Sequence, residues 1–503
     1  MEAWILLPVF LPILAGISLL ISSFCDHQRQ WQKKRISYDE KTRRRIHLLV
    51  ISVLGISCVL ALVAAWSGDR SVTLFYLMED IPIFFCIDDI SRLFVTFLSI
   101  VWMVVCIYSF KYMEHEGEEK RFFGFYLMVY GVLVAQDFSG NLVTLYMFYE
   151  LMTLTAMPLV FHNGSKEAMM AALKYLFYSM AGAYLALFAI FFLYQYCDTL
   201  TFTPGGTLNI ALATEHRELL LVSVMAMILG FGAKAGMLPL HAWLPAAHPV
   251  APAPASAVLS AIIVKSGVLA IVRGVFYIVG ADSIRGTWVQ TVWMTLALIT
   301  VFMGSMLAYR EKVFKKRLAY STVSQVSYIL FGLSLLSPVA MTGAFLHVVF
   351  HAFIKCALFL TAGIFIFRTG KTSVEEYTGI GRKMPKTLLY YTFASLALIG
   401  VPPASGFVSK WYLAEGALSS GTGIFEWLGP IVLLLSALLT AGYLLPVMMR
   451  GFFPGDASAF PKEKESLDGM SAMLLVLSML AVILGVVPNP LIRFVSTIAE
   501  TLL

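Results

Sequence analysis

Charged residues stand inside apolar stretches of the sequence that are long enough to cross a membrane. Lys234 and Lys265 lie in residues 230–267, GFGAKAGMLPLHAWLPAAHPVAPAPASAVLSAIIVKSG, together with His241 and His248. At bilayer depth a lysine costs roughly 2.5 to 3.5 kcal/mol even on the lenient insertion scale. Because residues this unfavourable in lipid usually serve a function, the combination of lysines, histidines and helix breakers predicts an ion path.

A carboxylate and a further lysine lie in the two spans before this stretch. Glu150 stands in the middle of the expected span 141–161, in LYMFYELMTL, where a carboxylate is unfavourable unless it is paired or protonated. Lys174, in AALKYLFYSM, lies about one turn inside the membrane. It either extends its ammonium to the interface as an anchor or serves as a proton entry. Glu150 is therefore a candidate ion-path residue, and Lys174 keeps both interpretations.

The second half of the chain carries a matching set of polar residues. His347, His351 and Lys355 follow at steps of four in the expected span 342–367, so their side chains share one helical face. In GVPPASGFVSK, two glycines and two prolines interrupt the next helix just before Lys410. The sequence therefore predicts a second polar region that ends at a broken helix.

A similar interruption is expected around Lys234, where GFGAKAGMLP should break the seventh span. We expect the carbonyls at the end of its first half-helix to stabilise the Lys234 ammonium by their dipole. Interrupted spans at corresponding places in two halves indicate an inverted-repeat transporter. The first repeat is placed at residues 120–280, spans four to eight, and the second at 287–450, spans nine to thirteen, with spans seven and twelve broken.

The remaining segments complete the predicted domain organisation. Residues 1–110 hold the N-terminal spans and, at 69–92, a stretch that is too polar to cross and alternates like an external hairpin or surface segment. Asp88 and Asp89 in this stretch are interpreted as turn residues. Residues 468–503 hold the C-terminal span.

Composition agrees with this plan. Of 503 residues 59% are hydrophobic and 13% are charged, whereas about a quarter are charged in an average globular domain. The chain has about fourteen apolar runs of roughly 20 residues, the length that crosses the hydrocarbon core. These numbers predict an all-α polytopic membrane protein of about 14 transmembrane helices, with its surface in the lipid bilayer.

Basic residues cluster in alternate loops. The densest stretch is residues 29–45, and later ones follow at 310–317, 368–386 and 450–464. The positive-inside rule places these loops in the cytoplasm. Both termini are therefore predicted outside, and the net charge of +6 needs no nucleic acid to explain it.

Cofactor motifs are absent from the sequence. The six cysteines form no CxxC pair, which argues against an iron–sulfur cluster, a structural zinc site or a haem attachment site. The sequence also has no nucleophile constellation and no phosphate loop. We therefore expect no cofactor, no metal and no catalytic or redox site of the chain's own.

Four long motifs together resemble one known family. They are LPLHAWLPAAHPVAPAPASAVLSAIIVKSGVLAIVR, LAYSTVSQ, HVVFHAFIKCALFL and GVPPASGFVSKWYL. They closely resemble the antiporter-like subunits of respiratory complex I, of Mrp-type cation/proton antiporters and of energy-converting membrane-bound hydrogenases. The likeness covers about residues 85–450. It is strongest to the Mrp D-type and hydrogenase-type subunits, because the chain stops soon after span fourteen.

The resemblance implies a role for each polar residue. Glu150 and Lys234 match the family's ion pair between spans five and seven, Lys265 the central lysine, and Lys410 the terminal group of the channel. The polar axis between them corresponds to His347, His351 and Lys355. One departure is Ala246, where many members carry an acidic residue, so a carboxylate has no role at this turn.

The implied mechanism is electrostatic. Glu150 near Lys234 keeps the lysine protonated, and separating the two pushes its proton toward Lys265 and along the axis to Lys410. In an antiporter the same gating moves a cation the other way. The alternative is that these groups only brace a helical bundle, since buried polar groups can be retained for specificity.

Three functions remain open at this point. The first is an ion-translocating subunit of a redox-driven multisubunit complex, working with other membrane subunits in a bacterial or archaeal cell membrane. The second is the D-type subunit of a stand-alone Mrp antiporter, and the third is the membrane subunit of an inorganic-carbon uptake system. The transported ion also stays open between H⁺ alone and Na⁺ exchanged for H⁺. Both kinds of transport use the same axis, and the sequence shows no oxygen-rich cage for a cation.

Overall fold

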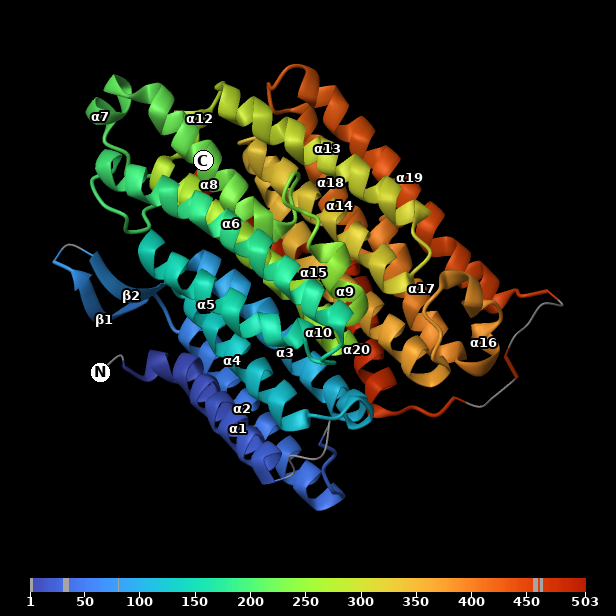
Figure 1. Ribbon diagram of the computed structural model, residues 1–503. Coiled ribbons are helices and arrows are strands. Elements are labelled where there is room, and N and C mark those ends of the chain that lie inside the picture. The colour runs from blue at the N-terminus through green and yellow to red at the C-terminus, as the bar shows by residue number, and fades with distance from the viewer. Residues whose placement is uncertain (1–2, 30–35, 80, 456–459, 462–464) are drawn as a thin grey trace.

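A computed structural model describes residues 3–29, 36–79, 81–455, 460–461 and 465–503. The described chain is mostly helical, and one two-stranded hairpin is added to the all-α architecture predicted from the sequence (Figure 1). Parts of the basic stretches predicted at 29–45 and 450–464 lie outside the described residues.

The helices and strands follow the expected order of spans. The N-terminal part holds η1 (Ala3–Leu6), α1 (Leu7–Arg29), α2 (Glu40–Trp66), β1 (Arg70–Met78), β2 (Ile81–Ile87), α3 (Asp89–Glu116) and α4 (Glu119–Asp137). The middle holds α5 (Leu142–Val160), α6 (Lys166–Tyr196), α7 (Ile210–Glu215), α8 (Arg217–Ala235), α9 (Leu244–Val250), α10 (Ala253–Val258), η2 (Leu259–Ile263), α11 (Val264–Val272), η3 (Arg273–Val279) and α12 (Ala281–Ile284). The remainder holds α13 (Trp288–Arg310), α14 (Phe314–Ser334), α15 (Pro338–Thr369), η4 (Val374–Tyr377), α16 (Ile380–Lys383), α17 (Pro385–Ile399), α18 (Ser405–Leu418), α19 (Ile424–Phe452), α20 (Gly469–Val486) and α21 (Asn489–Leu502).

The outer surface of the bundle suits a lipid bilayer. Within the described residues, eleven helices are long and apolar enough to cross a membrane. Large apolar side chains point outward from them, for example Phe177 on α6 and Leu434 on α19, each with 70% of its surface exposed. In water such a surface would be unfavourable, whereas lipid accepts it. The chain is therefore a multi-pass membrane protein.

The two ends of the bundle differ in structure. Strands β1 and β2 form an antiparallel hairpin where the sequence predicted one, and the start of η1 and the C-terminus lie toward the same end (Figure 1). We call this the hairpin end. The opposite end, called the basic end, carries α16 and the connections from α13 to α14 and from α15 to α17, which are rich in lysine and arginine.

Two helix breaks occur where the sequence predicts them. Helix α8 ends at Ala235, and Gly236 then adopts a left-handed backbone with φ of 78° before residues 237–243 lead to α9. Helix α17 ends at Ile399, Gly400 is left-handed with φ of 92°, and α18 begins at Ser405. Glycine suits both turns because it has no β-carbon to clash in this conformation.

The centre of the bundle is formed by the continuous segment from α10 to η3 and by α15, which are buried along almost their whole length. Close helix contact is achieved through small residues. A β-carbon on Gly267 of α11 would lie 2.6 Å from the Phe231 carbonyl oxygen of α8. Two π-helical segments, η2 and η3, flank α11. Such segments occur often at functional sites, and the sequence did not reveal them.

Candidate functional site

Lys234 lies at the end of α8 and reaches across to α5. Its side chain is fully buried, and its Nζ donates hydrogen bonds to the Tyr149 carbonyl at 3.2 Å and to Thr153 Oγ1. The ammonium also lies 3.9 Å from the centre of the Tyr149 ring, a cation–π contact. Lys234 stands in the last turn of α8, where the Trp243 indole N–H donates to the Ala233 carbonyl at 2.9 Å.

Glu150 lies near Lys234 but is not bonded to its ammonium. Among the described residues the two form no ion pair within 4.0 Å, although their charges still interact through space. One carboxylate oxygen, Oε1, is buried without a hydrogen-bond partner. The carboxylate also borders an apolar pocket of about 620 Å³ formed by the hairpin, α5 and α6. The side chain is therefore placed near Lys234 without direct contact.

Lys265 lies at the centre of the molecule, just after the π-helical segment η2. It is 1% exposed, and its Nζ donates to the Ser260 carbonyl at 2.7 Å. The same Nζ is 2.6 Å from Nδ1 of His351 on α15. A direct hydrogen bond between a lysine and a histidine requires that at least one of the two side chains be neutral, because an ammonium and an imidazolium can both only donate. This pair is therefore suited to exchange a proton.

The other residues of the α15 face extend in both directions from this pair. His347 stacks on His351 with ring centres 5.8 Å apart, and its Nδ1 lies 2.9 Å from Ser409 Oγ on α18. Lys355 lies toward the basic end and donates to the Leu318 carbonyl of α14 at 3.0 Å. The three side chains share one face of α15 as predicted. Of the three, His347 contacts α18, whereas Lys355 contacts α14.

Lys410 occupies the second helix break. Its Nζ donates to the carbonyls of Leu398 at 2.7 Å and Ile399 at 2.9 Å, the last two residues of α17. The ring of Tyr328 lies 5.4 Å away. Carbonyls at a helix C-terminus lack intrahelical donors and carry partial negative charge. The dipole arrangement expected at Lys234 is therefore found at Lys410.

Of the three residues predicted as possible proton entries, only His248 interacts with a member of this row, Lys355, within the described chain. Lys174 is exposed on α6, 5.9 Å from the Tyr178 ring, and its charge acts on His241 in the first helix break. His248 of α9 is fully buried and stacks on Phe359 at 4.6 Å. Neither ring nitrogen of His248 has a hydrogen-bond partner in the structure. His248 is thus a buried histidine near Lys315 at the basic end.

Several partners of the charged groups were not identified from the sequence. Thr153, Ser260 and Ser409 carry no signal of their own, because serine and threonine are common in membrane helices. Arg273 could have been found, since an arginine inside the apolar run LAIVRGVFYIV is as unusual as a lysine. In the described part of the chain no group of three His, Cys, Asp or Glu residues could hold a metal ion.

Together, the fold and the site define a polytopic membrane protein with a row of buried lysines and histidines between two broken helices. The family described as "NADH:quinone oxidoreductase/Mrp antiporter, TM" matches residues 139–454, and that described as "NADH-Ubiquinone oxidoreductase (complex I), chain 5 N-terminus" matches residues 78–123. The chain belongs to the NADH:quinone oxidoreductase/Mrp antiporter transmembrane family.

Similar proteins come from both branches of this family. The chain is 32% identical to the NADH-quinone oxidoreductase N subunit of Desulforudis audaxviator over 73% of this chain and 72% of that one. It is 28% identical to the Na(+)/H(+) antiporter D subunit of Bacillus subtilis over 100% of this chain and 98% of that one. Its fold matches a chain of the membrane-bound sulfane sulfur reductase, an archaeal respiratory membrane complex, with a TM-score of 0.82, 22% identity and coverage of 99% and 97%.

Proposed function

We propose that the chain is an ion-translocating membrane subunit of a multisubunit complex and that protons move along its buried row of lysines and histidines. The carrying observation is that Lys234, Lys265 and Lys355 are buried at membrane depth and bonded to neutral groups. A lysine without a direct counter-ion can lose its proton readily, because burial disfavours the charged form.

The proposed row consists of seven residues. They are Glu150, Lys234, Lys265, His347, His351, Lys355 and Lys410. Buried polar atoms without partners lie along it, including Nε2 of His347, Nε2 of His351 and both side-chain polar atoms of Gln325. Bound water usually satisfies such atoms, and a chain of water molecules would carry protons between the side chains.

Glu150 is the proposed switch. When its carboxylate turns toward Lys234 it stabilises the ammonium, and when it turns away the proton is driven toward Lys265. The separated arrangement described above supports this alternation. Proton entry is assigned to Lys174, His241 and His248, of which His248 lies nearest the basic end, and release is assigned to Lys410.

The fine architecture is part of the proposal. Eleven apolar helices, together with α4, α14 and the pair α17 and α18, give fourteen crossings. The two helix breaks support inverted five-helix repeats at 120–280 and 287–450, between the N-terminal region 1–110 and the C-terminal region 468–503. The basic end is assigned to the cytoplasm and both termini to the outside of a bacterial or archaeal cell membrane.

The first candidate for the complex is a redox-driven one, supported by the relative from NADH-quinone oxidoreductase. The second is a stand-alone Mrp antiporter, favoured by the match to the Na(+)/H(+) antiporter D subunit along the whole of both chains. The relatives do not favour an inorganic-carbon uptake system. Mass spectrometry of co-purifying subunits separates the first two, because iron–sulfur or nickel–iron subunits accompany the first and small Mrp-type membrane subunits the second.

The mechanism is tested with Lys234→Ala and Glu150→Ala in the assembled complex. Ion-gradient formation is measured in inside-out membrane vesicles with a pH-sensitive dye, with and without Na⁺. Each variant should lower the rate by about a hundredfold, the usual size of a lost proton-transfer group. The matched control is Lys111→Ala, because Lys111 is an exposed lysine on α3 whose one ion pair within the described residues is with Glu114. Normal gradient formation with either variant rejects the mechanism.

A further inference from the structure

A second row of polar groups leads from Lys265 toward the hairpin end, away from the row that ends at Lys410. Its members come from α4, η3 and the start of α3, and of them only Asp88 was singled out in the sequence, as a turn residue. They are Gln136, Asp137, Arg273, Asp88 and Ser91. No step of the proposed function uses them.

The row begins next to Lys265. Gln136 of α4 is 1% exposed, and its Nε2 donates to the carbonyl of Ser266 at 3.1 Å. Its Oε1 is buried and has no hydrogen-bond partner in the structure. A buried amide oxygen of this kind requires a donor, and water is the donor that buried polar groups usually find. The Gln136 amide oxygen is therefore suited to bind a water molecule where α4 packs on α11, one residue along the chain from Lys265.

Asp137 follows directly and is the second step. It ends α4, it is 5% exposed, and its backbone carbonyl accepts a hydrogen bond from Ser91 Oγ at 2.7 Å. The positive charge that acts on its carboxylate is that of Arg273. A carboxylate this deeply buried is unfavourable in its ionised form unless it is closely paired. Asp137 is thus a group that can accept a proton.

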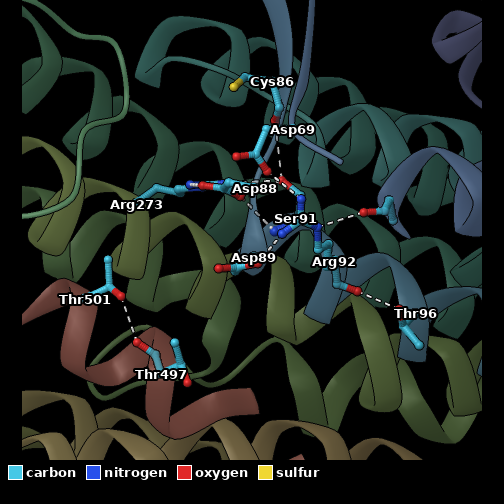
Figure 2. Close-up of polar contacts among 11 residues, drawn as sticks. Asp69, Cys86, Asp88, Asp89, Ser91, Arg92, Thr96, Arg273, Thr497 and Thr501 are labelled. Atoms are coloured by element: carbon cyan, nitrogen blue, oxygen red, sulfur yellow. Dashed lines mark hydrogen bonds and ion pairs between the residues drawn. The ribbon is translucent and has the colours of Figure 1, made fainter. Parts of the chain in front are cut away.

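The third step is the ion pair between Arg273 and Asp88 (Figure 2). The guanidinium donates to both carboxylate oxygens, at 2.5 and 2.7 Å, and to Ser91 Oγ at 3.1 Å. It also packs against the rings of Phe202 and Tyr277. The Arg273 side chain is 2% exposed whereas that of Asp88 is 32% exposed, so the row reaches the surface of the hairpin end.

A structural role explains the Arg273–Asp88 pair but leaves Asp137 without an explanation. Asp88 already supplies a bidentate carboxylate to Arg273 and also caps α3 by accepting from the Ser91 backbone N–H at 3.0 Å. In the described chain Arg273 makes no hydrogen bond to the Asp137 carboxylate. A second buried carboxylate near Arg273 is therefore not needed to pair that arginine.

We propose that this row is a branch of the proton path, from Lys265 to the hairpin end, in which Asp137 carries the proton and the Arg273–Asp88 pair controls its release. The proposal rests on the proposed function of Lys265. An N–H bond of the Lys265 ammonium breaks, an O–H bond forms on the Asp137 carboxylate through water at Gln136, and that proton then leaves at the hairpin end. Lys265 is left neutral and regains a proton from His351.

Proton translocation by the assembled complex tests the branch. Asp137→Asn, which keeps the shape and removes the proton acceptor, should lower the rate by about tenfold, and Asp137→Glu should restore most of it. The matched control is Asp89→Asn, because Asp89 is a half-exposed carboxylate at the same end that pairs with Arg92 and lies outside the row. This control should translocate normally.

Each outcome has a defined meaning. Normal translocation by Asp137→Asn overturns the branch, and so does a loss that Asp137→Glu fails to restore, because it assigns Asp137 a structural role. Lys265→Ala is measured alongside. If this variant translocates protons normally, the proposed function itself fails. If it loses translocation while Asp137→Asn translocates normally, only the branch is rejected.

Accessibility gives a second measurement that does not depend on turnover. Cys86, the native cysteine near the surface end of the row, is first replaced by serine (Figure 2). In that background Asp137→Cys should react with a membrane-impermeant thiol reagent added from the hairpin side, and faster than the buried native Cys106 of α3. Equal protection of both cysteines from that side overturns the branch.

Discussion

At the break after α8, Lys234 bonds to a hydroxyl and a backbone carbonyl of the neighbouring helix α5 and lies over a ring of that helix. At the break after α17, Lys410 bonds to two backbone carbonyls of its own broken helix. A carboxylate, Glu150, stands near the first lysine. Near Lys410, within the described residues, no carboxylate lies within ion-pair distance. The two breaks are alike in their chain path and different in what surrounds the charge.

This difference separates a switchable site from a fixed one. Side chains such as Thr153 and Glu150 can change rotamer, so the stability of the Lys234 ammonium can vary during a transport cycle. The carbonyls of Leu398 and Ile399 belong to the end of α17 and can move only with the helix. We infer that Lys234 is the regulated end of the row and Lys410 the end with constant electrostatics.

The largest expected effect comes from Gly406→Ala at the second break. A β-carbon there would lie 1.9 Å from the Ala397 carbonyl oxygen, so the backbones of α17 and α18 would have to separate. The separation would also displace the carbonyls that bind Lys410. We expect the free energy of unfolding to fall by about 3 kcal/mol, measured as a lower melting temperature of the purified complex.

Gly469→Ala is the control for this substitution. Nothing lies within 4 Å of the β-carbon at Gly469, at the start of α20, so the melting temperature should stay unchanged. Equal melting temperatures for Gly406→Ala and Gly469→Ala would show that the second break is not rigid and would remove the contrast with the first.

Arginine at either lysine position gives the next largest effect. Lys234→Arg and Lys410→Arg keep the positive charge, but a guanidinium does not release its proton in proteins. We expect assembled complex with proton translocation lowered by about a hundredfold in both cases, measured in membrane vesicles. If either arginine variant translocates at the normal rate, that lysine only braces the bundle.

The position of each helix break and each charged residue was predictable, because glycine, proline and intramembrane charges are local signals. The partner of Lys234 was not. Glu150 follows Tyr149 by one residue, about 100° around the helix, whereas Thr153 follows Tyr149 by four and shares its face. The rotation of α5 against α8, which packing determines, decides which of these side chains meets the ammonium.

The same reasoning explains two other differences. At the first break, Trp243, ten residues along the chain, donates to the end of α8, and the Lys234 ammonium bonds across to α5. Asp88 was interpreted as a turn residue, and it does cap α3, but its ion pair joins it to Arg273, 185 residues away. Such long-range contacts depend on the tertiary fold and leave no trace in local spacing.

A smaller effect is expected from Thr153→Val at the first break. The variant removes one of the two hydrogen-bond acceptors of the Lys234 ammonium and keeps the shape of the side chain. We expect the free energy of unfolding to fall by about 1 to 2 kcal/mol, seen in the melting temperature, with translocation lowered less than in Lys234→Arg. Thr155→Val is the control, because that hydroxyl bonds only within α5. Equal effects of the two variants would mean that Thr153 does not hold the ammonium.

The smallest effect is expected from Gly232→Ala, close to the first break. A β-carbon there would meet the terminal methyl of Met237 at 2.7 Å, the flexible end of a side chain that can rotate away. Alanine also favours the helix over glycine by about 1 kcal/mol, which offsets the crowding. The melting temperature and the translocation rate should both stay close to those of the unmodified complex. A loss as large as that of Gly406→Ala would mean that the first break is packed as rigidly as the second, and Lys234 would then lose its distinction as the end that can be switched.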